Sequence, residues 1–208
     1  MFIFRYIMVG NVGTGKTTLL YRLLNDKFIQ TSNTTIGLDI VNKNIVLPNN
    51  EGKVKLIIHD TSGQDKFKSI VYSILEQNIT CSIFVFDVSS RISFNYIKEQ
   101  LSVSSTLPLC CVLVGTKNDL KRQVSIKEGQ NLAFSHKMVD YFDISTKNDS
   151  YATIENIFIK SAQTILLQSI PLRQYQESGI VYIHPKKKKD IILEHENSES
   201  SRCQCVLI

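Results

Sequence analysis

A glycine-containing loop near the start of the chain, residues 10–17, constrains the fold more than any other segment. It fits the pattern G-x-x-x-x-G-K-[ST], follows a short apolar run, and opens a stretch with helical spacing. In such a loop several backbone N–H groups converge on a phosphate, and the N-terminus of the helix adds a positive partial charge. Lys16 offers a full charge to the outer phosphates, and Thr17 offers a hydroxyl to Mg²⁺. The loop predicts a phosphate site between a strand and a helix, without saying which nucleotide it holds.

The rest of the chain alternates between two kinds of segment. Short β-branched or aromatic runs lie at 2–9, 37–47, 53–60, 81–88, 109–115 and 139–144, and stretches with 3.6-residue spacing lie at 16–26, 66–78, 93–104, 126–136 and 154–168. Strand–helix alternation predicts an α/β fold with a mostly parallel sheet and helices on both faces. The connection 48–52 is short enough only for a hairpin. We therefore expect six strands, with one antiparallel strand at the edge.

The length of 208 residues allows one domain and a tail. The helical pattern stops at Gln168, and Pro171 follows, so we expect a domain at 1–170 and a flexible tail at 171–208. An apolar patch at 180–183 in that tail could pack back onto the domain, and the sequence leaves this open. The composition, 43% apolar and 21% charged, is that of a soluble globular protein, and no run of about 18 apolar residues occurs.

The charged and sulfur-containing residues narrow the function classes. The net charge is +5, but the lysine run 186–189 lies in the tail, so we expect no nucleic-acid partner. The run itself indicates contact with acidic lipid, a solvated segment or a nuclear address, and the acidic residues that follow it weaken the case for lipid. Cys81, Cys110 and Cys111 lie in strand-like runs and should be buried. Nothing suggests a disulfide framework, which favours a reducing, cytosolic compartment.

Two segments after the loop make the chain resemble Ras-type small GTPases, over about residues 2–169. Residues 35–37 are similar to the first switch of that family, and residues 60–64 to the second. The resemblance implies the small G-protein fold of P-loop NTPases, and Mg²⁺ held by Thr17, Thr35 and, through water, Asp60. It also implies that the Gly63 N–H bonds the γ-phosphate and that Gln64 is the catalytic residue that orients the attacking water.

Two further segments indicate the base. Asp119, in a T-K-x-D stretch, is an acceptor-only carboxylate that can take both the N1–H and the N2 amino group of guanine. The stem of Lys117 would lie over the purine, and residues 145–147 resemble the family segment whose backbone N–H reads guanine O6. The nucleotide-binding set expected for GTP and GDP is Asn11, Val12, Gly13, Thr14, Gly15, Lys16, Thr17, Thr18, Thr35, Gly63, Thr116, Lys117, Asp119, Ser145, Thr146 and Lys147.

The chain departs from the family pattern at several of these places. Val12 stands where a small residue is usual, beside the γ-phosphate, so slow and poorly stimulated hydrolysis is one hypothesis and a tolerated change is the other. Thr116 replaces the commoner asparagine, and we expect it to weaken the contact between base loop and phosphate loop. Ile40, His59 and Ile74 replace the aromatic effector surface of Rab proteins, so effector identity cannot be carried over.

The Rab branch is indicated by residues 35–39, which resemble T-I-G-V-[DE], and by the C-terminus. Residues 203–208 include a C-a-a-X box that favours geranylgeranyl on Cys205, and Cys203 suggests a second lipid. Two lipid chains anchor a protein stably to a membrane, whereas a single chain binds only reversibly.

The resemblance therefore implies a Rab-like, membrane-anchored GTPase switch in vesicle trafficking. It would sit on the cytoplasmic face of an intracellular membrane with a cytosolic pool, and a monomer is the default expectation. Its partners would be an exchange factor, a GTPase-activating protein, effectors and a prenyl-tail chaperone. The alternatives are a Ras- or Rho-like signalling GTPase and a GTP-loaded adaptor with little hydrolysis. A P-loop kinase is contradicted by Asp119, which selects guanine.

Overall fold

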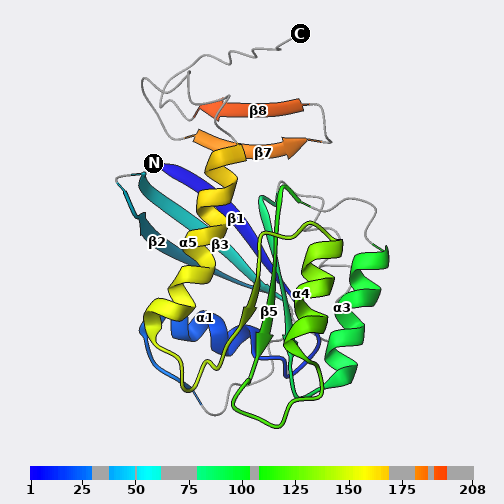
Figure 1. Cartoon of the computed structure of the whole chain (residues 1–208). Coiled ribbons are helices and arrows are strands. Elements are labelled where there is room, and N and C mark those ends of the chain that lie inside the picture. The colour runs from blue at the N-terminus through cyan, green and yellow to red at the C-terminus, as the bar shows by residue number, and fades with distance from the viewer. Residues whose placement is uncertain are drawn as a thin grey trace.

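The computed structural model describes residues 1–29, 38–49, 51–61, 79–103, 108–168, 181–186 and 190–195 (Figure 1). Its strands are β1 (Phe2–Val9), β2 (Leu38–Leu47), β3 (Gly52–Thr61), β4 (Cys81–Asp87), β5 (Cys110–Thr116), β6 (Tyr141–Asp143), β7 (Val181–Lys186) and β8 (Asp190–His195). Its helices are α1 (Lys16–Asn25), α3 (Arg91–Val103), α4 (Ile126–Ser135) and α5 (Tyr151–Gln168).

The main path of the sheet runs β2-β3-β1-β4-β5-β6. The four pairs from β3 to β6 are parallel, whereas β2 pairs antiparallel with β3 at the edge. The turn between β2 and β3 needs left-handed backbone, with φ 56° at Asn49 and 108° at Gly52, which these two residue types tolerate best. The predicted α/β fold, with six strands and one antiparallel edge strand, is confirmed on this path.

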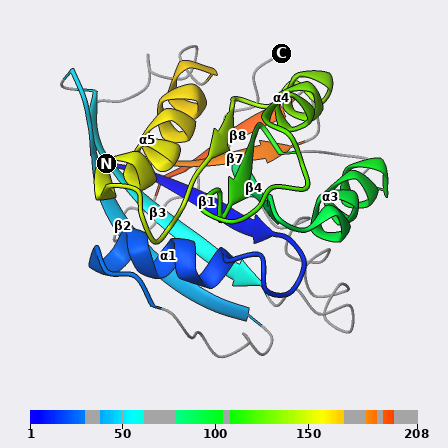
Figure 2. The same cartoon turned by 60° about the horizontal axis from the view of Figure 1, so that its bottom comes forward.

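Helices cover both faces of the sheet, α1 and α5 on one face and α3 and α4 on the other (Figure 2). The alternation along β1 explains the two cores. Phe4, Tyr6 and Met8 join the cluster under α1 and α5, while Ile7 and Val9 join the cluster under α3 and α4. Because both faces are buried, β1 is apolar or aromatic at every position except Arg5.

Two helices begin earlier than their apolar spacing predicts. α3 begins at Arg91 rather than at 93, and α5 begins at Tyr151 rather than at 154. The added residues, 91–92 and 151–153, are exposed or half-buried, so the periodicity of buried apolar residues does not detect them. At α5 the Ser150 hydroxyl accepts a hydrogen bond from the Thr153 N–H at 3.3 Å, which is how serine starts a helix. The helix predicted at 66–78 lies outside the described residues.

Two strands lie in the range expected to be a flexible tail. β7 pairs parallel with β1 at Phe2 and Ile3, and β8 pairs antiparallel with β7. β4 pairs with β1 only from Tyr6 onward, so β7 uses the part of that edge of β1 that β4 does not reach. The apolar patch at 180–183, left undecided by the sequence, thus contributes β7. This hairpin lies at the end of β1 opposite the phosphate loop (Figure 1).

The three internal cysteines, Cys81, Cys110 and Cys111, are buried and reduced, as expected. The sulfurs of Cys81 and Cys110 lie 3.5 Å apart on adjacent strands. Of the helices in the described part of the chain, none has both the length and the apolar character required to cross a bilayer.

Candidate functional site

The predicted site residues follow the carboxyl ends of the parallel strands. The phosphate loop follows β1, Asp60 lies near the end of β3, residues 116–119 begin at the end of β5, and residues 145–147 come shortly after β6. Parallel strands end at the same edge of the sheet, where open α/β sheets bind ligands. The described parts of the predicted site therefore meet at one edge.

The phosphate loop depends on glycine at two places for different reasons. Gly15, with φ 89°, is the N-cap of α1 and has no side chain to cap the first N–H groups, which suits capping by an anion. At Gly10 an added Cβ would lie 2.2 Å from the carbonyl oxygen of Val85 in β4. The end of β1 therefore approaches β4 more closely than any side chain allows.

Lys16 lies inside its own loop. Its Nζ donates to the carbonyl oxygens of Gly10 at 2.8 Å and Asn11 at 2.9 Å, and the residue is 6% exposed. Burial lowers the pKa of Lys16 to about 8, and the nearby Asp60 carboxylate partly opposes that shift. A phosphate bound at this loop would provide the anionic partner that stabilises the buried Lys16 ammonium.

Two of the three predicted Mg²⁺ ligands are in contact. The Thr17 hydroxyl donates to Asp60 Oδ2 at 2.7 Å, so both oxygens face one point between α1 and β3. Oxygen donors are what Mg²⁺ prefers, and Mg²⁺ commonly takes one or two protein ligands together with substrate phosphates. No cluster of three or more His, Cys, Asp or Glu side chains suited to a metal occurs within the described ranges. The donor set thus fits Mg²⁺ shared with a nucleotide.

The two segments predicted to read the base are joined directly. The Ser145 hydroxyl donates to Asp119 Oδ1 at 2.6 Å, which orients the carboxylate. The Ser145 N–H is taken by Asp149 Oδ2 at 2.9 Å, and Asn118 Nδ2 donates to the Asp143 carbonyl at 3.1 Å. The loops after β5 and β6 therefore form one unit around Asp119.

Thr116 ties the base loop to the phosphate loop. Its hydroxyl lies 2.7 Å from the Thr14 carbonyl oxygen and 3.0 Å from the Phe86 carbonyl oxygen, in a buried position. Threonine therefore makes the contact between the two loops, and the expected weakening relative to asparagine stays a prediction. One hydroxyl carries one proton, so it donates to one carbonyl at a time.

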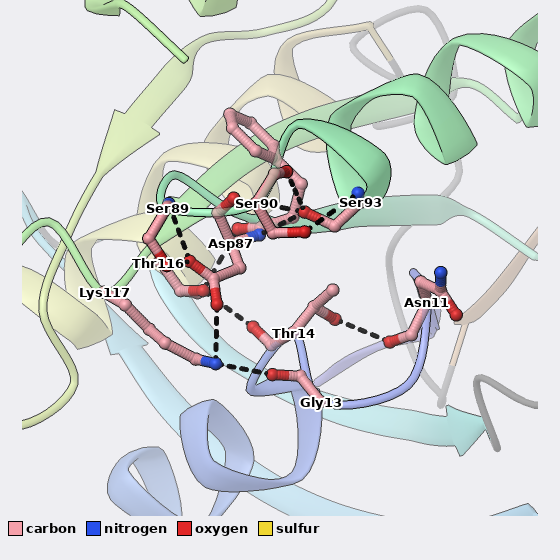
Figure 3. Close-up of polar contacts among 10 residues, drawn as sticks. Asn11, Gly13, Thr14, Asp87, Ser89, Ser90, Ser93, Thr116 and Lys117 are labelled. Carbon is pink, nitrogen blue, oxygen red and sulfur yellow. Dashed lines mark hydrogen bonds and ion pairs between the residues drawn. The ribbon is translucent and has the colours of Figure 1, made fainter. Parts of the chain in front are cut away.

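Lys117 makes a second tie between the same loops (Figure 3). Its Nζ donates to the Gly13 carbonyl oxygen at 2.7 Å and pairs with Asp87 Oδ2, also at 2.7 Å. Asp87 is not among the predicted site residues. The available signal was its place near the carboxyl end of the strand-like run 81–88, at the edge of the sheet where the site was expected.

The remaining predicted residues divide into two groups. Thr18 is half-buried in the first turn of α1, Thr146 is buried, Lys147 is exposed, and the Val12 side chain is 47% exposed at the tip of the loop. Thr35, Gly63, Gln64, Cys203 and Cys205 lie outside the described residues.

Two of the three positions matched to the Rab effector surface are neighbours. Ile40 of β2 pairs with His59 of β3, and Ile40 is 56% exposed. Burial, and then the charge of Arg5, lower the pKa of His59. Both effects favour the neutral imidazole of His59. Ile74 lies outside the described residues.

Comparison with known proteins agrees with this geometry. A model of the Ras family matches residues 5–167. The Ras-related protein Rab-2B of Dictyostelium discoideum is 34% identical over 176 residues, covering 81% of this chain and 84% of the relative. The human Ras-related protein Rab-4B is 33% identical over 171 residues, covering 79% and 77%. The Ras-related protein Rab-4 of Dictyostelium discoideum is 29% identical over 220 residues, covering 99% and 98%.

Proposed function

Because this chain belongs to the Ras family and is a Rab-like small GTPase, we propose that it is a membrane-anchored switch that cycles slowly between GTP and GDP in vesicle trafficking. The observation that carries the proposal is the closed junction of the three loops. Thr116 and Lys117 of the base loop bond the phosphate loop, and Asp119 of the same loop is oriented by Ser145. A site joined in this way suits one ligand that has a purine and a phosphate chain at fixed separation.

Guanine recognition rests on Asp119 and the segment after β6. With Oδ1 taking the Ser145 hydroxyl, the carboxylate keeps further lone pairs for the N1–H and N2 amino group of guanine. Adenine offers no such pair of donors and would leave Asp119 poorly paired. Since Asp149 occupies the Ser145 N–H, the backbone donor for guanine O6 has to come from Thr146 or Lys147.

In the proposed hydrolysis, Lys16 gives up its contacts with the loop carbonyls and binds the outer phosphates of GTP, because an anion stabilises a buried ammonium better than carbonyl oxygens do. Thr17, Asp60 and Thr35 would hold Mg²⁺, which would neutralise charge on the β- and γ-phosphates. Gln64 orients the attacking water, and the Gly63 N–H bonds the γ-phosphate. Loss of that phosphate releases residues 35 and 63 and ends effector binding.

Single-turnover hydrolysis of GTP on the purified chain with Mg²⁺ tests the switch. We expect slow but finite conversion to bound GDP, on the order of 10⁻⁴ to 10⁻² s⁻¹, because the transition state has no arginine from a partner. Gln64→Leu is the control that should stop the conversion. GTP retained for hours without conversion would instead favour the GTP-loaded adaptor.

Replacing Val12 tests whether the departure in the phosphate loop slows hydrolysis. The side chain is 47% exposed at the loop tip, where a β-branched group would crowd the attacking water and an incoming arginine. Val12→Gly is expected to raise the single-turnover rate about tenfold, because it removes a group that crowds the attacking water beside the reacting phosphate. An unchanged rate would make Val12 a tolerated variant.

The membrane part of the proposal rests on the C-terminal sequence. Cys205 in its C-a-a-X box and Cys203 two residues before it supply one or two lipid anchors, which would place the domain on the cytoplasmic face of an intracellular membrane, with a cytosolic pool. An exchange factor, a GTPase-activating protein, effectors and a prenyl-tail chaperone are the partners that such a switch requires. A Ras- or Rho-like signalling role is the second candidate, and the membrane to which the protein localises would separate the two.

A further inference from the structure

We propose that Asp87 is a positioning residue for nucleotide retention, which holds the Lys117 ammonium against the phosphate loop and so slows the release of bound guanine nucleotide. This inference rests on the proposed function and names a residue outside the predicted nucleotide-binding set. It follows from the contacts at the end of β4 (Figure 3).

The Asp87 carboxylate is fixed by its own turn. Its Oδ1 accepts hydrogen bonds from the Ser89 N–H at 2.8 Å and the Ser89 hydroxyl at 2.6 Å. Its backbone N–H donates to the Ser93 hydroxyl in α3 at 3.0 Å. One carboxylate oxygen and the backbone are thus held locally, and the other oxygen, Oδ2, faces Lys117.

Lys117 is the more mobile member of the pair. Its side chain is 35% exposed, compared with 11% for Asp87, and a lysine side chain is a flexible four-carbon stem with many rotamers. The backbone of Lys117 is left-handed, with φ 58°, so it leaves β5 in an unusual direction. A fixed carboxylate beside a flexible cation selects the cation's position, and not the reverse.

The position selected is the one that closes the site. From there the ammonium also donates to the Gly13 carbonyl oxygen, so β4, the base loop and the phosphate loop share one charged junction. Without the Asp87 charge, the Lys117 ammonium would sample solvent. Of the two contacts between the base loop and the phosphate loop, that of the Thr116 hydroxyl would then remain. Opening of the loops should then become easier, which affects release more than capture.

The test is release of fluorescently labelled GDP from the full-length chain with Mg²⁺, measured after adding excess unlabelled GDP. Asp87→Asn keeps the shape and an oxygen for Ser89 but removes the charge, and we expect release about tenfold faster, which corresponds to about 1.4 kcal/mol. Asp140→Asn is the control. It removes the ion pair with Lys160, which is 3.0 Å long and lies outside the three loops of the site, and release should change less than about twofold.

Coupling to Lys117 separates positioning from a general loss of structure. In a Lys117→Met background, which lacks the ammonium, Asp87→Asn should change release less than about twofold. The same factor in both backgrounds, or no greater effect than Asp140→Asn, would overturn the inference.

A second variant loosens the carboxylate without altering its charge. Ser89→Ala removes one of its local hydrogen bonds and should speed release about threefold. No change would count against the fixed-carboxylate argument. If the unaltered chain failed to retain labelled GDP, or released it as fast as labelled ADP, the proposed function itself would fail.

Discussion

Asp119→Asn is expected to weaken GDP binding about a thousandfold and to create affinity for xanthosine diphosphate, because a site built to hydrogen-bond a base rejects an analogue that leaves its polar groups unpaired. The amide oxygen still accepts from N1–H, but the amide nitrogen faces the N2 amino group, donor against donor. Xanthine has a carbonyl oxygen at that position, which the amide nitrogen can bond. The Ser145 hydroxyl, which now donates to Asp119 Oδ1, would hold the amide in the same place.

Competition of GDP and xanthosine diphosphate against labelled GDP, on the unaltered chain and the variant, measures this exchange of preference. Asp140→Asn is a suitable control. The Asp140 side chain is 42% exposed, and its carboxylate pairs at 3.0 Å with Lys160, which lies in α5. Its nucleotide affinities should match those of the unaltered chain. Equal loss of both nucleotides in Asp119→Asn would mean that Asp119 supports the loop without reading the base.

Gly10→Ala is expected to destabilise the domain by about 4 kcal/mol or more, since the new Cβ would lie 2.2 Å from the Val85 carbonyl oxygen. Gly10 directly follows β1 and the clashing atom is a backbone oxygen within β4, so no flexible side chain can yield. The backbone at Gly10 is not left-handed, and the whole penalty therefore comes from the contact. For a domain of this size the melting temperature should fall by about 8–16 °C, measured by circular dichroism at saturating GDP.

Gly52→Ala separates this contact from the general effect of adding a methyl group. Gly52 has φ 108° and nothing within 4 Å of an added Cβ, so only backbone strain of about 1–2 kcal/mol is expected. If Gly10→Ala melted no lower than Gly52→Ala, the close approach of β1 and β4 would not exist in solution.

Much of the fold could be predicted because its signals are local. β1 appears as a buried apolar run, and the short connection before β3 permits nothing but a hairpin, which makes β2 antiparallel. The starts of α3 and α5 were missed because their first residues are exposed or half-buried and do not continue the buried apolar periodicity. β7 was missed because its partner is the first strand, about 180 residues away, and local sequence does not encode such a choice.

The candidate site likewise contains residues that local sequence patterns predict and residues that they do not. The phosphate loop and the base loop follow fixed patterns whose chemistry is readable at each position, as with the acceptor-only Asp119. Asp87 was missed because its role depends on how neighbouring loops meet. Asp87 acts on Lys117 only because β4 and β5 align residue 87 with residue 116, and that register cannot be read from either strand alone.

The junction of the loops also has a consequence for how the chain is made. Gly13 and Lys117 are 104 residues apart, and Ser145 comes later still. At synthesis rates of about 5–20 residues per second, the phosphate loop leaves the ribosome about 5–20 s before the base loop exists. During that interval a nucleotide could bind only through its phosphates. Ligand binding can therefore stabilise this domain only late in translation, and chains stalled before β6 would gain little protection from GDP.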